Sequence, residues 1–229
     1  MPALPEFELP PYRLSGVVVG ALLNHAPALA ALDEAVSAPP YKTAPKAPVL
    51  QVKPRNTLCG DGAVVEVPGD VDALEIGATL ALVIGRTARR VNEAQALDCI
   101  AGYGVAADLS VASDAPDRHY RPGVRQRARD GFCPTGSQVR AAADVPSPDA
   151  LAVSVAIDGV VVHRTDTAGR VRGVARLLAD VSAFMTLQPG DLLLLGASHG
   201  APCARAGQQV RVEIEGLGSL HFELRAEPP

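Results

Sequence analysis

The sequence contains no tryptophan and only four phenylalanines and four tyrosines among its 229 residues. Its core must therefore be built from valine, leucine, alanine and isoleucine, which suits a compact β structure. An excess of positive charge is also missing. The formal net charge is −4, and the arginines are scattered rather than grouped with stacking aromatic residues. These absences argue against a nucleic-acid partner.

The four cysteines form no C-x-x-C pair, which argues against a zinc site or a redox pair. We expect Cys59, Cys99, Cys133 and Cys203 to be buried thiols of a cytoplasmic protein. The first residues show no basic region leading into an apolar one, and the apolar run VVVGALL is too short to span a bilayer. The sequence therefore predicts a cytoplasmic protein that is neither secreted nor in contact with a membrane.

Hydrophobic periodicity predicts a single β-rich α+β domain over residues 16–229, preceded by an extended, proline-rich N-terminal arm over residues 1–15. Amphipathic patterns predict helices over 28–38, over 91–101 closed by Gly102, and over 173–187. A hairpin is expected to turn at Asp158–Gly159, and a long ordered loop is expected over 112–136. The other apolar and alternating segments predict strands.

One of these strands, LEIGATLALVIG at residues 74–85, carries an unusual set of side chains on one face. Side chains alternate along a strand, so Glu75, Gly77 and Thr79 share a face while the aliphatic residues between them take the other. The aliphatic face predicts burial in the core. The opposite face raises the question of whether it carries chemistry.

Two charged segments are candidates for binding an anion. VKPRNTL places Lys53 and Arg55 at a strand end, where they could hold a carboxylate or form a solvated turn. The loop YRPGVRQRARDGFCP holds four arginines, flanked by aromatic residues and closed by Asp130-Gly131, and predicts an anion pocket in which some arginines are plain surface charges. Asp108, predicted at a strand end, could be a metal ligand or a cap.

Seven motifs occur in order between about residue 16 and residue 225: KPRNTL, VIGRTARRV, IAGYGVAAD, YRP, RDGFCPTG, FMTLQPGDLLLLG and VRVEIEGLGSL. Together they resemble the fumarylacetoacetate hydrolase family, in particular the N-terminal half of its bifunctional isomerase/decarboxylase members of the 4-hydroxyphenylacetate (homoprotocatechuate) pathway. The resemblance implies the fold of the family's C-terminal domain, a mixed β-sandwich roll with a few peripheral helices.

The resemblance also implies a divalent cation, usually Mg²⁺, held by a Glu-x-Glu pair and an Asp. Asp108 matches the third ligand, but Gly77 and Thr79 stand in place of the two glutamates. Glu75, on the same face, is not expected to complete the site. Because Mg²⁺ needs two or more charged oxygens, we expect a metal in this chain to be weakly bound or absent.

Other positions of the family's site are changed as well. Ala28 and Ala31 replace a catalytic His and Glu, Arg127 replaces a lysine, and Gly196-Ala197-Ser198 replaces Gly-Thr-Pro. The expected catalytic residues are Arg127, Lys53 and Thr167, the last matching a threonine that the family places near the substrate. The expected substrate-binding residues are Arg55, Tyr120, Arg121 and Asp130.

The function implied is that of a subunit of 5-oxopent-3-ene-1,2,5-tricarboxylate decarboxylase / 2-hydroxyhepta-2,4-diene-1,7-dioate isomerase, which acts on a small dicarboxylate or tricarboxylate 2-oxo acid. The alternative is a non-catalytic half that supports a metal-bearing homologous subunit. A third interpretation is a metal-independent hydrolase or tautomerase. The resemblance further implies a homo-oligomer or a hetero-oligomer with a homologous second subunit.

Overall fold

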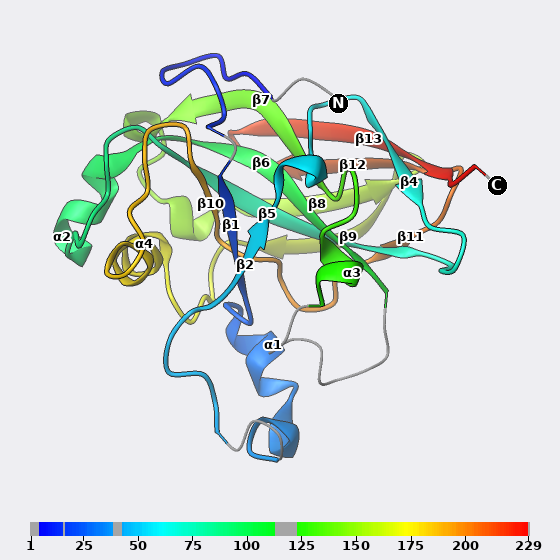
Figure 1. The fold of residues 1–229 in the computed structure, drawn as a ribbon, viewed down its shortest axis with the longest axis horizontal. Helices are drawn as coiled ribbons and strands as arrows, with labels where there is room; N and C mark the ends of the chain where they lie inside the picture. The colour runs from blue at the N-terminus through cyan, green and yellow to red at the C-terminus, as the bar shows by residue number, and fades with distance from the viewer. Residues whose placement is uncertain (1–4, 16, 39–42, 113–122, 229) are drawn as a thin grey trace.

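The computed structural model describes residues 5–15, 17–38, 43–112 and 123–228, in which two β-sheets pack together with short helices around them (Figure 1). The first sheet has eight strands in the order β2 (Val49–Lys53), β1 (Val18–Leu22), β10 (Leu192–Leu194), β5 (Leu74–Ile84), β6 (Ile100–Val111), β7 (Cys133–Ala141) and β3 (Leu58–Cys59), with β11 (Cys203–Ala204) also paired to β5. The second has the order β4 (Ala63–Val67), β13 (Gly218–Ala226), β12 (Gln209–Ile214), β8 (Ala152–Ile157) and β9 (Val160–Asp166). This confirms the predicted β-rich mixed fold.

The long antiparallel pair β5–β6 forms the centre of the first sheet, and the two faces of β5 have different surroundings. Ile76, Leu80 and Leu82 lie in the main core, which also includes the apolar face of the second sheet. Ala81 and Val83 face a smaller apolar cluster on the other side. Glu75, Gly77 and Thr79 lie on the same face of β5 as Ala81 and Val83, but nearer the start of the strand.

The N-terminal segment was expected to be extended, and for residues 5–14 this is wrong. The Phe7 amide donates to the Tyr12 carbonyl over 2.8 Å and the Leu14 amide donates to the Pro5 carbonyl over 3.3 Å, so the chain turns back on itself. Phe7 and Leu14 are buried in the smaller apolar cluster, beside Ala81 of β5. Burial of these two side chains favours the turn over an extended arm.

The helix predicted over 173–187 is present but ends earlier, as α4 (Val174–Ser182), which buries one apolar face and contacts α2 (Glu93–Ala96); Leu187 instead forms a β-bridge with Ala88. The helix expected over 28–38 is instead divided into α1 (Ala26–Ala30) and a 3₁₀ turn, η1 (Asp33–Val36). Asp33 has a φ of 42°, and neither element has a buried residue. Without a packed face, a continuous helix here lacks the tertiary contacts that stabilise short helices.

Two expectations about β6 are wrong. Gly102 does not close a helix: α2 is followed by a 3₁₀ turn, η3 (Leu97–Cys99), and Gly102 lies within the strand. A Cβ atom at Gly102 would stand 2.4 Å from the Arg140 carbonyl oxygen, so the glycine permits the close approach of β7. Asp108 lies inside β6, which ends at Val111, and is therefore not a cap at a strand end.

Local turn chemistry predicted the hairpin correctly. Asp158 and Gly159 have φ values of 50° and 81°, as a type I′ turn requires, and join β8 to β9. The long loop is shorter than expected because β7 begins at Cys133. Within its described part it contains a single helical turn, α3 (Val124–Arg127). The other 3₁₀ turns among the described residues are η2 (Arg55–Thr57), η5 (Ala142–Asp144) and η6 (Pro148–Ala150).

The thiols of Cys59, Cys99 and Cys133 are buried as predicted. Burial raises the pKa of the Cys59 thiol to about 12 and that of Cys133 to about 11, so both stay protonated at neutral pH. Cys203 is exposed, which corrects the prediction, because it lies on the two-residue strand β11 at the margin of the sheet. Among the described residues, no helix is long and apolar enough to cross a membrane.

Candidate functional site

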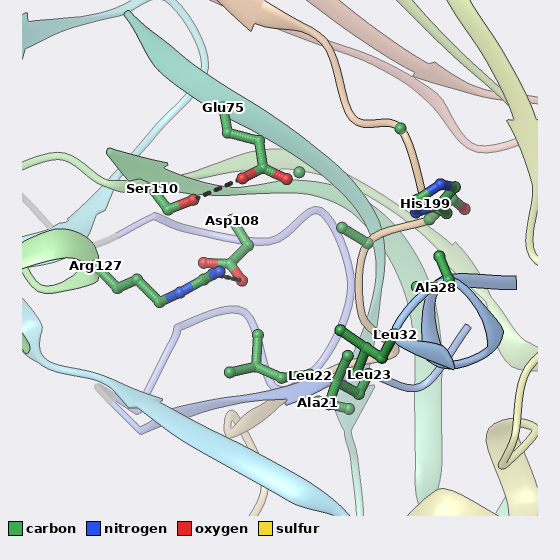
Figure 2. Close-up of a pocket in the computed structure, with 15 residues that line it drawn as sticks. Ala21, Leu22, Leu23, Ala28, Leu32, Glu75, Asp108, Ser110, Arg127 and His199 are labelled. Atoms are coloured by element: carbon green, nitrogen blue, oxygen red, sulfur yellow. Dashed lines mark hydrogen bonds and ion pairs between the residues drawn. The ribbon is translucent and has the colours of Figure 1, made fainter. Parts of the chain in front are cut away.

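A pocket of about 220 Å³ lies over the start of β5 and the end of β6 (Figure 2). One wall is aliphatic and comes from the end of β1 and the α1–η1 segment: Ala21, Leu22, Leu23, Ala28, Ala31 and Leu32. The inner end carries polar side chains from the two central strands and α3: Glu75, Asp108, Ser110 and Arg127. The outer wall is the segment 197–200. Glu75 and Gly77, from the unusual face of β5, therefore line this pocket.

Asp108 is the centre of a buried ion cluster at the inner end of the pocket. Its Oδ1 accepts a hydrogen bond from Lys53 Nζ over 2.8 Å, and its Oδ2 lies 3.3 Å from Arg127 Nη1. Gln51 Nε2 also donates to Oδ2. The exposed side-chain fractions are 1% for Lys53, 5% for Asp108 and 17% for Arg127. Figure 2 shows the Arg127 guanidinium reaching the Asp108 carboxylate.

Backbone and amide contacts hold the two cations in place. The Asn56 side chain donates to Asp130 Oδ1 over 2.7 Å, and the Gly131 amide donates to the Asn56 carbonyl over 3.0 Å. These bonds join the KPRN turn to the RDG turn. Lys53 Nζ also donates to the Arg127 carbonyl over 2.9 Å. Two motifs that are far apart in the sequence thus bring their charges to one carboxylate.

The predicted site residues divide into two groups. The structure brings Lys53, Asp108 and Arg127 together, as just described. Arg55 and Asp130 are exposed, and Asp130 is engaged with Asn56. Tyr120 and Arg121 lie outside the described residues. Their substrate contacts, and those of Arg55 and Asp130, stay predictions.

Thr167 lies apart from the residues that line the pocket. It is 1% exposed, its hydroxyl donates to the Pro148 carbonyl over 2.7 Å, and the same oxygen accepts from the Leu151 amide over 2.9 Å. These bonds attach the segment after β9 to the segment before β8. Its described contacts are therefore structural, and the predicted catalytic role stays a prediction.

The residues at the expected metal position do not fit a divalent cation. Both oxygens of Asp108 already accept from nitrogen donors. Gly77 lies directly opposite Asp108, and a Cβ atom there would stand 2.5 Å from the Asp108 carbonyl oxygen. Thr79 is 1% exposed, and its hydroxyl accepts from the Gly196 amide over 3.0 Å.

The remaining carboxylate at this end is also engaged. Glu75 Oε2 accepts a hydrogen bond from Ser110 Oγ over 3.3 Å. Within the described ranges, no three His, Cys, Asp or Glu side chains are grouped as metal ligands. Ala28 and Ala31 line the pocket with methyl groups, so the positions that the resemblance gives to an acid/base pair hold no group able to transfer a proton.

The outer wall is bound by an arginine that the sequence analysis did not single out. Arg170 donates through Nη1 to the Ala197 carbonyl over 3.3 Å and through Nη2 to Ser198 Oγ over 3.0 Å. It also donates to the carbonyls of Thr167 and Asp166. Burial lowers the pKa of Arg170 to about 10, which leaves it cationic at neutral pH.

Two histidines accompany this arginine. The His199 amide donates to His25 Nδ1 over 2.9 Å, and His199 lines the pocket. Burial, followed by the positive charges of Arg170 and His199, lowers the pKa of His25. Arg170, His25 and His199 form no periodic or metal-binding pattern in the sequence. The only sequence feature that pointed to the outer wall was the change at Gly196-Ala197-Ser198.

A family model for the C-terminal domain of fumarylacetoacetate hydrolase matches residues 17–225. The chain belongs to this family. Over 207 residues it is 39% identical to the 4-hydroxyphenylacetate degradation bifunctional isomerase/decarboxylase of Escherichia coli. The aligned region covers 90% of this chain and 46% of the relative. Over 186 residues it is 33% identical to a mitochondrial oxaloacetate tautomerase of Oryza sativa subsp. japonica, covering 79% of this chain and 82% of the relative.

Solved structures of family members have the same fold. The 5-carboxymethyl-2-hydroxymuconate delta-isomerase from Mycobacterium smegmatis matches with a TM-score of 0.78 at 27% identity, covering 94% of this chain and 81% of that chain. The 2-hydroxyhepta-2,4-diene-1,7-dioate isomerase from Mycobacterium marinum matches with a TM-score of 0.75 at 27% identity, covering 94% and 77%. This member of the fumarylacetoacetate hydrolase family spans about half the length of the bifunctional relatives that it matches.

Proposed function

We propose that this chain is one half of an isomerase/decarboxylase of 4-hydroxyphenylacetate catabolism, and that it supports a homologous, metal-bearing subunit. Similarity over 90% of this chain to about half of the bifunctional enzymes supports the first part. The substrates we propose for the assembly are 5-oxopent-3-ene-1,2,5-tricarboxylate, for decarboxylation, and 2-hydroxyhepta-2,4-diene-1,7-dioate, for isomerisation.

The observation that carries the supporting role is the pairing of Asp108 with Lys53 and Arg127. Decarboxylation and proton shift next to a 2-oxo group both develop enolate charge, which an accessible cation must stabilise. Here the two cations are directed at the protein's own carboxylate. The aliphatic wall adds no acid or base at Ala28 and Ala31, so we assign the chemistry to the second subunit.

Reconstitution tests this proposal. The metal-bearing homologous subunit is assayed alone, with this chain, and with an equal mass of serum albumin, while loss of substrate absorbance is followed in the ultraviolet. We expect the two subunits to elute together in gel filtration and the mixture to exceed the turnover of the metal-bearing subunit alone. Separate elution with unchanged turnover would remove the supporting role.

The same assay distinguishes the metal-independent alternative. Turnover by this chain alone that survives a chelator would indicate a hydrolase or tautomerase that uses the pocket without a metal. That result would replace the supporting role with catalysis by this chain.

A further inference from the structure

The Asp108 carboxylate is buried, and each of its two oxygens accepts from at least one nitrogen donor. Lys53 Nζ donates to Oδ1, whereas Arg127 Nη1 and Gln51 Nε2 donate to Oδ2. With 5% of its side chain exposed, Asp108 has little access to water. A carboxylate removed from water requires compensating charge and hydrogen bonds, and here the protein supplies both.

Lys53 is even more buried than its partner, with 1% of its side chain exposed. Within the described part of the chain, its ammonium donates to the Asp108 carboxylate at 2.8 Å and to the Arg127 carbonyl at 2.9 Å. A buried ammonium is as unfavourable without an anion as a buried carboxylate is without a cation. Breaking the contact with Asp108 would therefore leave the Lys53 ammonium buried without an anion.

We infer that Lys53 and Arg127 are the built-in counter-charge of Asp108, and that this pairing closes the pocket to divalent cations. Two single positive charges supply the same total charge as one divalent ion. They meet the one carboxylate that this chain shares with the expected metal site. The inference goes beyond the proposed function, and it concerns this chain whether or not a second subunit is present.

Neighbouring residues add a second reason for exclusion. A cation next to Asp108 would be repelled by two positive side chains, and it would find few further ligands. Gly77, directly opposite Asp108, offers no side-chain oxygen. A larger residue at this position would clash with the Asp108 carbonyl oxygen. Glu75 is held by Ser110. A hard cation such as Mg²⁺ or Mn²⁺ requires several oxygen ligands at once.

The first test measures metal binding directly on the purified chain. Mn²⁺ is titrated into the wild type and followed by calorimetry and by the electron paramagnetic resonance signal of free Mn²⁺. Thermal unfolding is then measured in Mn²⁺, in Mg²⁺ and in chelator. We expect no saturable binding and the same melting temperature in all three. Stoichiometric binding, or a melting temperature that falls in chelator, would overturn the inference.

The second test removes the counter-charge. Lys53→Met keeps most of the apolar stem but leaves Asp108 with one cation, and we expect a clearly lower melting temperature that Mn²⁺ partly restores. Lys46→Met is the matched control, because Lys46 is exposed. Its melting temperature should stay close to that of the wild type and should not respond to Mn²⁺. Equal effects of the two substitutions would contradict the role given to Lys53.

A double variant keeps the test decisive if Lys53→Met does not fold. In Lys53→Met/Asp108→Asn a neutral carboxamide replaces the carboxylate and needs no ammonium, so this variant should be more stable than Lys53→Met and insensitive to Mn²⁺. A double variant less stable than Lys53→Met would show that the ammonium does not compensate the carboxylate. Neither test uses turnover, so failure here is distinguishable from failure of the proposed function.

Discussion

The inner end and the outer wall of the pocket handle positive charge in different ways. At the inner end, Lys53 and Arg127 are paired with the full negative charge of Asp108. At the outer wall, the acceptors described for the Arg170 guanidinium are three backbone carbonyls and the Ser198 hydroxyl. The comparison indicates that the inner end depends on ion pairing, whereas the outer wall depends on hydrogen bonds that fix loop positions.

The largest expected effect comes from breaking the inner end. Asp108→Ala leaves the buried Lys53 ammonium beside Arg127 without an anion, and removing one partner of a buried ion pair lowers the free energy of unfolding by about 3–5 kcal/mol. Urea denaturation measures the change. Asp72→Ala is the control, because Asp72 is exposed and is not part of the Asp108 cluster. Similar losses in both variants would show that burial of the pair is unimportant.

At the outer wall, Arg170→Met should have a smaller effect. It removes the donor shared by Ala197 and Ser198, and loss of hydrogen bonds from a charged group lowers the free energy of unfolding by about 1.5–3 kcal/mol. Hydrogen exchange should increase over residues 196–200. Arg164→Met, at an exposed position on β9, is the control. If exchange over 196–200 stayed unchanged, Arg170 would not hold this wall.

Gly77 separates the two regions and tests how closely they approach. A Cβ atom at this position would stand 2.5 Å from the Asp108 carbonyl oxygen and 3.1 Å from Ala197 Cβ. Overpacking of this kind lowers the free energy of unfolding by about 1–3 kcal/mol in Gly77→Ala. In Gly60→Ala the added methyl group meets nothing within 4 Å and serves as control. Equal stability of the two variants in urea would contradict the close approach.

The smallest expected effect is a pH dependence at the outer wall. Burial, then Arg170 and His199, lowers the pKa of His25, although Asp166 acts in the opposite direction. As the pH falls below about 6.5, the unfolded chain binds a proton at His25 before the folded chain does, so stability falls. Above about pH 7.5 this contribution is fully present.

The His25→Gln variant isolates this effect, because glutamine keeps an oxygen acceptor for the His199 amide. Urea midpoints between pH 7.5 and 5 should fall less steeply in the variant than in the wild type. Burial also lowers the pKa of His163. This residue therefore contributes to the fall of the urea midpoint with pH in both proteins. An identical slope in the two proteins would contradict the shift assigned to His25.

Elements defined by local signals could be predicted from the sequence. The turn at Asp158–Gly159 requires two positive φ values, and α4 buries a face with helical periodicity. The errors concern residues whose role depends on distant partners. Gly102 resembles a helix stop in the sequence, but it is required by the approach of Arg140 from β7.

The same distinction applies to the site. The motifs drew attention to Lys53, Asp108 and Arg127 as separate candidates. Their mutual pairing joins residues 55 and 19 positions apart in the sequence, and spacing alone does not show which side chains meet. Arg170 and His25 were missed because most of their contacts are to backbone atoms of segments brought together by the fold.

Turnover by the isolated chain is the most direct test of the claim that its pocket is not a metal-dependent catalytic site. Purified chain is incubated with 5-oxopent-3-ene-1,2,5-tricarboxylate in Mg²⁺ and then in chelator, and loss of absorbance is followed in the ultraviolet. Folding is checked by circular dichroism on the same sample. We expect a folded chain with no turnover in either condition. Turnover that appears with Mg²⁺ and disappears with chelator would contradict it.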